Sequence, residues 1–418
     1  MVTSRVGVVV IGGGPAGISA AIAASVDGAS VLLVEKDVRL GGTLKQAIHD
    51  GFGLLRYDER LTGPEYAFRD IDTLDQTNTL VMLQTFVSRI IRIGNGFQLT
   101  LCNRYGIVFV ETKSIVLATG CIERTARQMF IHGSRPAGVM TAGSAQYFTN
   151  IMGQLPAKYS LMLGSGDIGL VMARRLTLEG AKVLGVYEPK QAPEGLLRNV
   201  SECLNDFNIP LHCEHTVTYV SGNQRLKGVV ISRVDKNQNP IRGSENLVKC
   251  DSLIISVGLI PDIELAESLG IPISTITHGP VCDQNYMTLV DGIYCCGNAV
   301  HINGVVDYIS ESGDIAGRGA ARHIERDRQL IEIHTSKDFL YSVPQYLDFE
   351  MMRGETALLF KPKETHENVV VSVFVDGNSV MSQEFLTLRP QEVERIVVNF
   401  DSVLYPESRV EIRMEANR

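Results

Sequence analysis

The sequence lacks any block of basic residues and any long hydrophobic run near its start, and each absence excludes a class of partner. Its formal net charge is −8 and its pI is about 5.7, so nothing attracts nucleic-acid phosphates or an anionic membrane surface. The apolar stretch ahead of the first glycines, Val6 to Ile11, is interrupted by Gly7 and is too short for a signal peptide or a membrane span. We therefore expect a cytoplasmic protein whose partners are small molecules or other proteins, with no nucleic acid and no membrane span.

Cysteine spacing is the second informative absence. None of the eight cysteines belongs to a CxxC pair, which argues against a zinc ribbon, a cysteine-ligated iron–sulfur cluster and a thioredoxin-like dithiol. We expect no metal site. Cys295 and Cys296 are adjacent; a vicinal disulfide is one interpretation, and the favoured one is two small apolar residues at the end of a buried strand.

The residues that are present predict an α/β protein of two or three domains. At 418 residues, 44% of them hydrophobic, the chain is too long for one ordinary core. An apolar run, Val8 to Ile11, precedes a small-residue stretch, Ile18 to Ser25, which is typical of a buried parallel strand followed by a helix. Between them Gly12, Gly14 and Gly17 form GxGxxG, where glycine permits a tight turn, the approach of a pyrophosphate and close helix packing.

An acid after the next strand completes a dinucleotide-binding pattern, and the pattern then recurs. The apolar stretch Val31 to Val34 ends at Glu35, which can accept hydrogen bonds from ribose hydroxyls. Four glycines recur at a constant offset of 152 residues, so that Gly12, Gly14, Gly17 and Gly28 correspond to Gly164, Gly166, Gly169 and Gly180. An internal duplication of a nucleotide-binding βαβ unit is the natural interpretation, and it predicts two dinucleotides in one chain.

The second copy departs from the first at its acid. The residue at the constant offset from Glu35 is Tyr187, and Glu188 lies one position beyond, so this acid is out of register. No arginine pair follows Glu188, so a 2′-phosphate has no evident partner and NAD(H) is favoured over NADP(H). ATP at the second site, or no nucleotide there, is the alternative.

Three further motifs complete a resemblance to a known family. The sequence has "VLATG" at Val116 to Gly120, "IISVGLIPD" at Ile254 to Asp262 and "GIYCCGNA" at Gly292 to Ala299. With the two glycine motifs, and in this order, they resemble the FAD- and NAD(P)-dependent pyridine nucleotide oxidoreductases, flavoproteins with two dinucleotide-binding domains, over about residues 5 to 330. The resemblance implies FAD at the first motif and NAD(H) at the second. Asn298 is a departure, because the family usually has an aspartate there that bonds the flavin ribityl chain.

The resemblance also assigns residues to each cofactor. Those expected at the FAD are Gly12, Gly14, Pro15, Ala16, Gly17, Glu35, Lys36, Gly42, Thr43, Val87, Ala118, Thr119, Gly120, Gly297 and Asn298. Those expected at the second nucleotide are Gly164, Gly166, Asp167, Ile168, Gly169, Glu188 and Gly258. No catalytic acid or base is assigned. His301, near the Asn298 turn, and Cys121, directly after "ATG", are the candidates, with a structural role as the alternative for each.

A narrower resemblance rests on "RPAGVMTAGSAQYF", Arg135 to Phe148. It is similar to the nucleotide-binding subunits of dye-linked L-proline dehydrogenase, hydrogen cyanide synthase and opine oxidase, and to flavoproteins associated with glycerol-3-phosphate dehydrogenases. This implies a partner flavoprotein dehydrogenase subunit that oxidises an amine or an alcohol, in an oligomeric assembly. The disulfide reductases that are resembled carry a cysteine pair after "GGT". Here Gly41 to Thr43 are followed by Leu44 to Gln46, so electrons must leave the flavin without a dithiol relay.

The expected organisation is two Rossmann-like domains, the second inserted in the first, followed by a small C-terminal all-β domain. The FAD-binding domain is predicted at 1–150 and 281–330 and the NAD(H)-binding domain at 151–280. A β-sandwich-like domain is predicted at 337–418, because this stretch has period-2 strands. We predict that this last domain contacts another protein; a passive cap is the alternative.

Smaller patterns complete the prediction. The stretches 79–110 and 211–249 alternate β-branched residues with turn signals, as antiparallel insertions do. Gly304 to His323 predicts a glycine-bearing helix, whose N-terminus the resemblance directs at the flavin pyrimidine, where its dipole would favour negative charge; packing of the FAD domain alone is the other interpretation. Asp376 and Gly377 predict a hairpin turn.

These features lead to one functional hypothesis and two alternatives. The leading hypothesis is an FAD-containing oxidoreductase in which hydride passes between NAD(H) and the flavin, as the electron-transfer subunit of a multi-subunit dehydrogenase. One alternative is a flavin-dependent dehydrogenase or oxidase that acts directly on an amine or a hydroxy acid. The other is a non-enzymatic, nucleotide-binding structural subunit.

Overall fold

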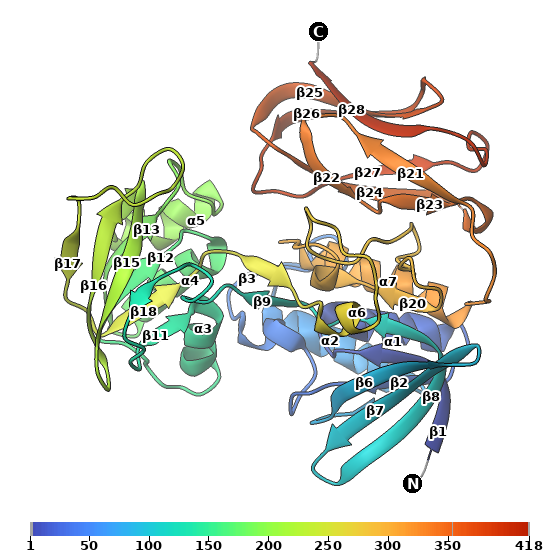
Figure 1. The fold of residues 1–418 in the computed structure, drawn as a ribbon, viewed down its shortest axis with the longest axis horizontal. Helices are drawn as coiled ribbons and strands as arrows, with labels where there is room; N and C mark the ends of the chain where they lie inside the picture. Colours follow the sequence, from blue (N-terminus) through green and yellow to red (C-terminus); the bar gives the residue numbers. More distant parts are fainter. Residues whose placement is uncertain (1–2, 353, 417–418) are drawn as a thin grey trace. The chain divides into compact units, whose positions relative to one another are not determined.

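The structure is a computed structural model that describes residues 3–352 and 354–416. The chain divides into two compact units, Met1–Cys121 with Pro261–Arg418 (unit 1) and Ile122–Ile260 (unit 2). Figure 1 shows the elements of both units coloured along the chain. Within the described residues, no helix is both long and apolar enough to cross a membrane.

Unit 1 is built around a seven-stranded sheet. Six of its strands have the order β5-β2-β1-β8-β7-β6, and the seventh, β20, pairs with β8. Its strands are β1 (Thr3–Ile11), β2 (Val31–Val34), β5 (Leu80–Met82), β6 (Phe86–Ile93), β7 (Gly96–Asn103), β8 (Gly106–Leu117) and β20 (Ile293–Cys295). The neighbours β5, β2, β1 and β8 pair in parallel, and so do β8 and β20. The strand β7 pairs antiparallel with both β8 and β6. The buried strands are apolar because helices and loops cover both faces.

The antiparallel insertion expected at 79–110 is confirmed in β6, β7 and the start of β8. The expectation is wrong for β5. Leu80 to Met82 pair in parallel with β2, so this segment extends the nucleotide-binding sheet. The antiparallel part begins at Phe86. Turn signals alone cannot distinguish these two pairings, because they mark where a strand ends and carry no information on its neighbour.

Two helices pack directly against each other in unit 1. They are α1 (Pro15–Val26) and α7 (Val306–Ala321), and α2 (Gly63–Asp75) lies beside α1. A Cβ added to Gly313 would lie 2.1 Å from the carbonyl oxygen of Ala16, and one added to Gly317 would lie 2.2 Å from that of Ala20. The predicted glycine-bearing helix is therefore confirmed, and its glycines allow the backbones of α1 and α7 to touch.

Unit 2 contains a second parallel sheet, with the order β11-β18-β12-β13-β14. Its strands are β11 (Val139–Thr141), β12 (Tyr159–Leu163), β13 (Lys182–Glu188), β14 (Leu211–Cys213) and β18 (Ser252–Ile255). Its helices are α3 (Ala142–Asn150), α4 (Asp167–Leu178) and α5 (Leu197–Cys203). Two strand-helix-strand units built on GxGxxG motifs therefore occur in one chain, and the fold class is α/β with two Rossmann-like domains.

A smaller sheet in unit 2 has the order β10-β15-β16-β17. Its strands are β10 (His132–Gly133), β15 (His215–Gly222), β16 (Leu226–Arg233) and β17 (Asn246–Val248). The antiparallel pairing of β15, β16 and β17 confirms the insertion expected at 211–249, except at its start. Leu211–Cys213 forms β14, which pairs in parallel with β13 and belongs to the main sheet.

The remaining short elements lie in connecting segments. They are β3 (Asp50–Phe52), β4 (Leu61–Thr62), β9 (Cys121–Glu123), β19 (Leu259–Pro261), α6 (Glu264–Ser268) and the 3₁₀ turns η1 (Gly42–Gln46), η2 (Asn205–Phe207), η3 (Gly297–Ala299) and η4 (Phe349–Met351). The strands β9 and β19 pair with each other in the two stretches of chain that link the units.

The borders of unit 2 differ from the predicted 151–280. The chain from 122 onward already belongs to unit 2, because β11 pairs with β18 and Ala142 and Ala145 of α3 pack in the same core as α4. The chain from 261 onward belongs to unit 1, where Ala266 and Ile271 pack in the core of the large sheet. Which nucleotide each unit binds stays a prediction.

The C-terminal part of unit 1 is a sandwich of two sheets, with the orders β23-β21-β28-β25-β26 and β22-β24-β27. Its strands are β21 (Leu330–Thr335), β22 (Phe339–Val343), β23 (Tyr346–Asp348), β24 (Glu355–Pro362), β25 (His366–Val375), β26 (Asn378–Leu388), β27 (Glu394–Asn399) and β28 (Val410–Ala416). These strands share a core of their own. We call this sandwich the β domain; its first strand begins at Leu330, before the expected 337.

The predicted hairpin turn of the β domain is confirmed. Val375 and Asn378 are paired at the ends of β25 and β26, so Asp376 and Gly377 form a two-residue loop. Both have positive φ, 51° and 84°, which two-residue hairpin turns require. Asp376 also accepts hydrogen bonds from Ser408 and Arg409, which fasten the turn to the segment just before β28.

Candidate dinucleotide-binding sites

The first glycine loop connects β1 to α1 and leaves no room for side chains at two of its glycines. Gly12 has a φ of +110°, and an added Cβ would lie 2.3 Å from the carbonyl oxygen of Ala118. A Cβ on Gly17 would lie 1.8 Å from the carbonyl oxygen of Gly12. These two glycines bring the loop and the first turn of α1 against the end of β8, as predicted from the spacing.

The middle glycine of the loop is an open position, by which we mean that an added Cβ would clash with no neighbouring atom. Gly14 precedes α1 and has an ordinary φ of −81°, and the nearest atom to an added Cβ is the Cα of Gly42, at 3.8 Å. Pro15 is the first residue of α1, where its missing N–H costs no hydrogen bond. The backbones of Gly14 and Gly42 lie against each other at the N-terminus of α1, since a Cβ added to Gly42 would lie 2.9 Å from the Cα of Gly14. A helix N-terminus without side chains in front of it fits an approaching pyrophosphate.

Glu35 is held at the end of β2 by two backbone groups. Its Oε2 accepts a hydrogen bond from the N–H of Gly13 at 2.6 Å, and its Oε1 accepts one from the N–H of Asp37 at 2.7 Å. Glu35 is 8% exposed. Because each carboxylate oxygen can accept more than one hydrogen bond, the fixed carboxylate can still accept from ribose hydroxyls.

The second glycine loop, between β12 and α4, repeats this geometry. Gly164 has a φ of +89°, and a Cβ there would lie 2.1 Å from the carbonyl oxygen of Ser256. A Cβ on Gly169 would lie 2.6 Å from the Cβ of Ser256. Gly166 is again the open position, with its nearest neighbours at 3.5 Å. The loop therefore fits a second dinucleotide.

The structure corrects the register of the second acid. In the first copy, Glu35 directly follows the residue that pairs with Ile11. In the second copy, Glu188 directly follows the residue that pairs with Leu163, the counterpart of Ile11. The pairing of β12 with β13 shifts by one residue on the way, so a bulge in β13 supplies the extra position. Glu188 is therefore the structural equivalent of Glu35, and the expectation that Tyr187 holds this place is wrong.

The hydrogen bonds of Glu188 agree with this equivalence. Its Oε2 accepts from the N–H of Ser165 at 2.9 Å and from the Ser165 hydroxyl at 2.6 Å, while Oε1 accepts from the N–H of Lys190 at 3.0 Å. Glu188 is 2% exposed. Ser165 corresponds to Gly13, so the two acids bind the same backbone position of their glycine loops.

The duplication extends further than the glycine motifs. Past the acid, Gly41 donates its N–H to the carbonyl oxygen of Gly13 at 2.7 Å, and Gly195 donates its N–H to that of Ser165 at 3.0 Å. The offset has grown from 152 to 154 residues between these pairs, so a search at constant offset misses them. Both loops that follow the acids therefore fold back onto the glycine loops.

Several predicted ligand residues have other visible roles. The Oδ1 of Asp167 accepts from the N–H of Leu196 at 2.9 Å and from Nδ2 of Asn199 at 2.7 Å, which fastens α5 to α4. Ile168 packs against the unit 2 core, and Val87 is buried in the unit 1 core.

The other predicted residues lie around the loops. Ala118 lies under Gly12, and the Thr119 hydroxyl donates to the carbonyl oxygen of Asp262 at 2.7 Å. Ala16 is buried and Gly120 is half-buried, whereas Lys36, Thr43 and Gly258 are exposed. Their contacts with a nucleotide stay predictions.

Asn298, the predicted departure from the family pattern, has a defined amide orientation. Its Oδ1 accepts from the N–H of Asn303 at 2.9 Å, and its Nδ2 lies 3.7 Å from Sγ of Cys121. A backbone N–H can only donate, so the side-chain atom facing Asn303 must be the oxygen. Asn298 follows Gly297 in η3, and its amide hydrogens are the groups available on the other side.

The two catalytic candidates differ in their surroundings. His301 is 4% exposed, and burial lowers its pKa to about 4, so it is neutral at pH 7. Its Nδ1 lies 3.4 Å from the hydroxyl of Tyr341, in the β domain. Cys121 lies beside Asn298 and is half-buried. Neither location identifies a proton donor, and both assignments stay predictions.

An acidic cluster that the motifs did not indicate supports α7 and the loop between β3 and β4. Arg56 Nη1 lies 2.7 Å from Oδ2 of Asp314, and its Nε lies 3.5 Å from Oδ1 of Asp70. Tyr57 donates its hydroxyl to Asp70 at 2.6 Å. Burial raises the pKa of Asp70 to about 6. Asp307, in the first turn of α7, accepts the N–H of Arg56 at 3.2 Å. These residues lie far apart in the sequence, so no local signal could have indicated the cluster.

The chain matches a known family over most of its length. Residues 6–320 match the pyridine nucleotide-disulphide oxidoreductase family. The chain belongs to this family. Pyridine nucleotide-disulphide oxidoreductases bind FAD and NAD(P), and this member is accordingly a flavin-dependent oxidoreductase with two glycine loops suited to those cofactors. No disulfide joins any two of the eight cysteines, all of which lie within the described residues.

Two relatives carry the names of enzyme subunits. An opine oxidase subunit of Agrobacterium tumefaciens (strain Ach5) is 26% identical over 357 residues, which cover 80% of this chain and 68% of that protein. The hydrogen cyanide synthase subunit HcnB of Pseudomonas aeruginosa is 28% identical over 348 residues, which cover 77% and 71%. The predicted resemblance to both is confirmed.

Solved structures show the same fold. Thioredoxin reductase from T. acidophilum superposes with a TM-score of 0.62 at 22% identity, covering 76% of this chain and 98% of that one. L-proline dehydrogenase from P. horikoshii superposes with a TM-score of 0.55 at 22% identity, covering 77% and 55%.

Proposed function

We propose that this chain transfers hydride between NAD(H) and a bound FAD, and that it serves as the electron-transfer subunit of a multi-subunit dehydrogenase. The observation that carries the proposal is the equivalence of Glu188 and Glu35, each fixed by two backbone N–H groups beside an open glycine. Two loops with the same acid, the same open position and the same fold-back contact support two dinucleotides in one chain.

The residues of unit 1 hold the first dinucleotide in this proposal. Gly14 and Gly42 carry no side chain that would keep the pyrophosphate from the N-terminus of α1, and Glu35 accepts from the adenosine ribose. The Asn298 amide, fixed by Asn303, donates toward the ribityl chain. The flavin, when bound, supplies the hydride and single-electron chemistry that no amino acid side chain provides.

The second dinucleotide is proposed to be NAD(H). Glu188 is buried and keeps both oxygens on N–H groups of the chain, so a 2′-phosphate would meet a fixed negative charge. Lys190, the nearest cation along the chain after the acid, pairs with Glu194. A phosphate would therefore find repulsion where a ribose hydroxyl finds an acceptor.

Electrons are proposed to leave without a redox disulfide. After Gly42 and Thr43 the chain continues with Leu44, and Leu44 is buried in the core beside α2. No thiol pair therefore stands at the position where disulfide reductases of the family carry one. The names of the two relatives support a second redox centre in a partner protein.

The test is anaerobic stopped-flow mixing of the FAD-loaded protein with NADH and with NADPH. We expect flavin absorbance to bleach with NADH at a rate that saturates with its concentration, and more slowly with NADPH. An amine or glycerol 3-phosphate should leave the flavin of the isolated chain oxidised. Direct bleaching by either compound, with no response to NADH, would contradict the proposal and favour a dehydrogenase that acts on the compound itself.

A further inference from the structure

The β domain contacts a segment of unit 1 that also carries part of the proposed flavin site. Gln345 and Cys282 exchange two hydrogen bonds, since Cys282 N–H donates to the Gln345 side chain at 3.0 Å and Gln345 N–H donates to the Cys282 carbonyl at 3.1 Å. Gln284 and Asp348 do the same, at 2.7 Å and 3.0 Å. Three of these four hydrogen bonds use a glutamine side-chain amide, and together they fix the β domain to the chain just ahead of β20.

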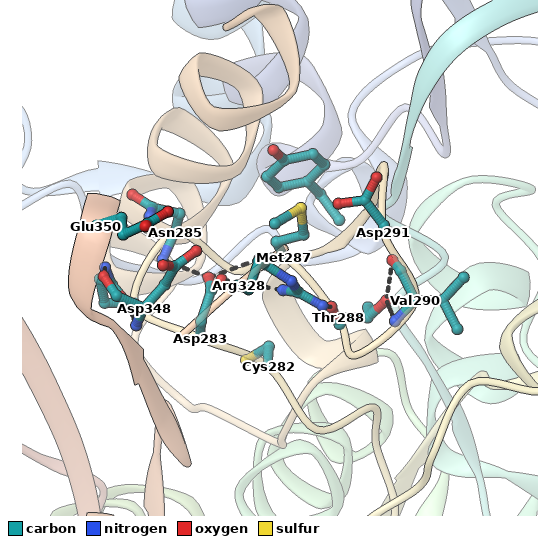
Figure 2. A network of polar contacts seen from close by, with 12 residues as sticks. Cys282, Asp283, Asn285, Met287, Thr288, Val290, Asp291, Arg328, Asp348 and Glu350 are labelled. Carbon is teal, nitrogen blue, oxygen red and sulfur yellow. Dashed lines mark hydrogen bonds and ion pairs between the residues drawn. The ribbon is translucent and has the colours of Figure 1, made fainter. Parts of the chain in front are cut away.

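A buried ion pair holds the same loop. Figure 2 shows Asp283 facing Arg328, which belongs to the linker between α7 and β21. Nη1 of Arg328 lies 3.3 Å from Oδ2 of Asp283, and Nη2 donates to the carbonyl oxygen of Thr288 at 2.8 Å. The side chains of Asp283 and Arg328 are 0% and 8% exposed. Asp283 also accepts the N–H groups of Asn285 and Met287. The loop therefore has little freedom to move independently of the linker.

The β domain also contacts the chain beyond β20. The Tyr341 hydroxyl lies 3.4 Å from Nδ1 of His301. Arg395 pairs with Glu311 of α7 at 2.6 Å, and its guanidinium lies over the ring of Tyr308, 5.7 Å from the centroid. The β domain thus contacts His301, two residues beyond η3, and the first half of α7. The backbone of α1 packs against the glycines of α7.

Along the chain, Gly297 and Asn298 lie between the residues that the β domain and its linker contact at 282–288 and those that the β domain contacts at 301–311. Gly297 also packs against α1, where an added Cβ would lie 2.8 Å from the Cβ of Ala16. We propose that the β domain is a working part of the flavin site, in which Tyr341 and Arg395 are positioning residues that fix the orientation of the Asn298 turn and of the α7 N-terminus. This inference rests on the proposed FAD site. It replaces the alternatives of a passive cap and of a domain whose only role is to bind another protein.

Close packing supports this role. A packed interior transmits small displacements because its side chains have no empty space to move into. His301 is three residues beyond Asn298 and 4% exposed. Loss of the Tyr341 hydroxyl would therefore change the position of His301 and, with it, that of the Asn298 turn. Losing one such polar contact costs about 1 kcal/mol, or a factor of about five in an equilibrium constant.

The test uses the full-length apoprotein with Tyr341→Phe, Arg395→Met and the double variant. Matched controls in the same domain are Tyr405→Phe and Arg409→Met, whose side chains are 66% and 70% exposed. FAD affinity is measured by flavin fluorescence titration. The environment of the bound flavin is measured by visible circular dichroism, and the stability of the fold by thermal unfolding of the apoprotein.

We expect the FAD dissociation constant to rise about three- to tenfold in each single variant and further in the double variant, with a changed visible dichroism spectrum. The controls should stay within about twofold of the wild type. Tyr341→Phe keeps the ring and its packing, so it remains a folded test even if Arg395→Met is unstable. An unchanged affinity and spectrum in Tyr341→Phe and Arg395→Met would overturn the inference. A wild-type protein that binds no FAD would contradict the proposed function itself.

Discussion

The open glycines of the two loops allow the two proposed sites to be disabled separately. In the structure, a methyl group on Gly14 would lie 3.8 Å from its nearest neighbour, and one on Gly166 would lie 3.5 Å from its nearest neighbours. Neither residue has a positive φ, so alanine is compatible with the backbone at both positions. If the proposed sites are correct, the added methyl group would stand where the pyrophosphate approaches each loop.

The expected effect on folding is small, and the expected effect on binding is large. Both glycines precede a helix, where alanine is somewhat less favourable than glycine. The lower chain entropy of alanine in the unfolded state offsets this by about 0.4–1 kcal/mol. A phosphate displaced by a methyl group loses one charge-assisted hydrogen bond of about 1.5–3 kcal/mol, which corresponds to an increase of about 10- to 150-fold in the dissociation constant.

The assay compares the two variants with each other. Gly14→Ala should purify with little FAD and an unfolding temperature close to that of the wild-type apoprotein. Gly166→Ala should keep FAD and its visible spectrum but require about 10- to 150-fold more NADH for half-maximal bleaching. If Gly166→Ala responds to NADH like the wild type, the second loop does not hold the nicotinamide nucleotide, and the reasoning from loop geometry is refuted.

Three further predictions follow from buried titratable or charged side chains. Glu188→Gln removes the fixed charge near the proposed 2′-hydroxyl, so the preference for NADH over NADPH should fall at least about tenfold in stopped-flow titrations; an unchanged ratio would refute the assigned role. Arg328→Met leaves Asp283 buried without its cation and should lower the free energy of unfolding by about 3–5 kcal/mol at pH 8. Because burial raises the pKa of Asp283 to about 7, the loss should be smaller at pH 5, where the carboxyl is protonated, and Asp283→Asn in the same chain should restore part of it; equal losses at both pH values would contradict this. Burial lowers the pKa of His301 to about 4, so below about pH 6.5 the unfolded chain takes up a proton that the folded chain refuses. Between pH 7 and 4.5 the wild type should therefore lose about 2–3 kcal/mol more stability in urea unfolding than His301→Asn does, and parallel losses would show that His301 is not buried.

The local patterns predicted the parts of the fold whose causes are local. Gly12 and Gly164 occur where the backbone needs positive φ and touches a neighbouring strand, and such positions are visible as glycines. The Asp376-Gly377 turn is visible for the same reason. The helix α7 was predicted as a glycine-bearing helix, and the structure shows Gly313 and Gly317 against the backbone of Ala16 and Ala20.

The features that were missed depend on register and on distant parts of the chain. The bulge in β13 changes the offset by one residue, so comparison at constant spacing placed Tyr187 opposite Glu35. The pairing of β5 with β2 was not predictable from the turn signals around it.

Long-range contacts were beyond the motifs altogether. The Asp283–Arg328 pair joins residues 45 apart, and the Arg56–Asp314 contact joins residues 258 apart. Each side chain by itself resembles a solvated surface charge in the sequence. In the folded chain these side chains are largely buried and paired, and the two pairs stabilise the attachment of the β domain and of the loop beside α2.

The measurement that tests the central claim most directly is an anaerobic titration of the FAD-loaded protein with NADH, followed at the visible absorbance of the flavin. Two equivalent loops, one for each dinucleotide, predict stoichiometric bleaching that Gly166→Ala weakens. A protein that binds FAD and keeps its visible absorbance at excess NADH would contradict the claim that the second loop delivers a nicotinamide nucleotide to the flavin.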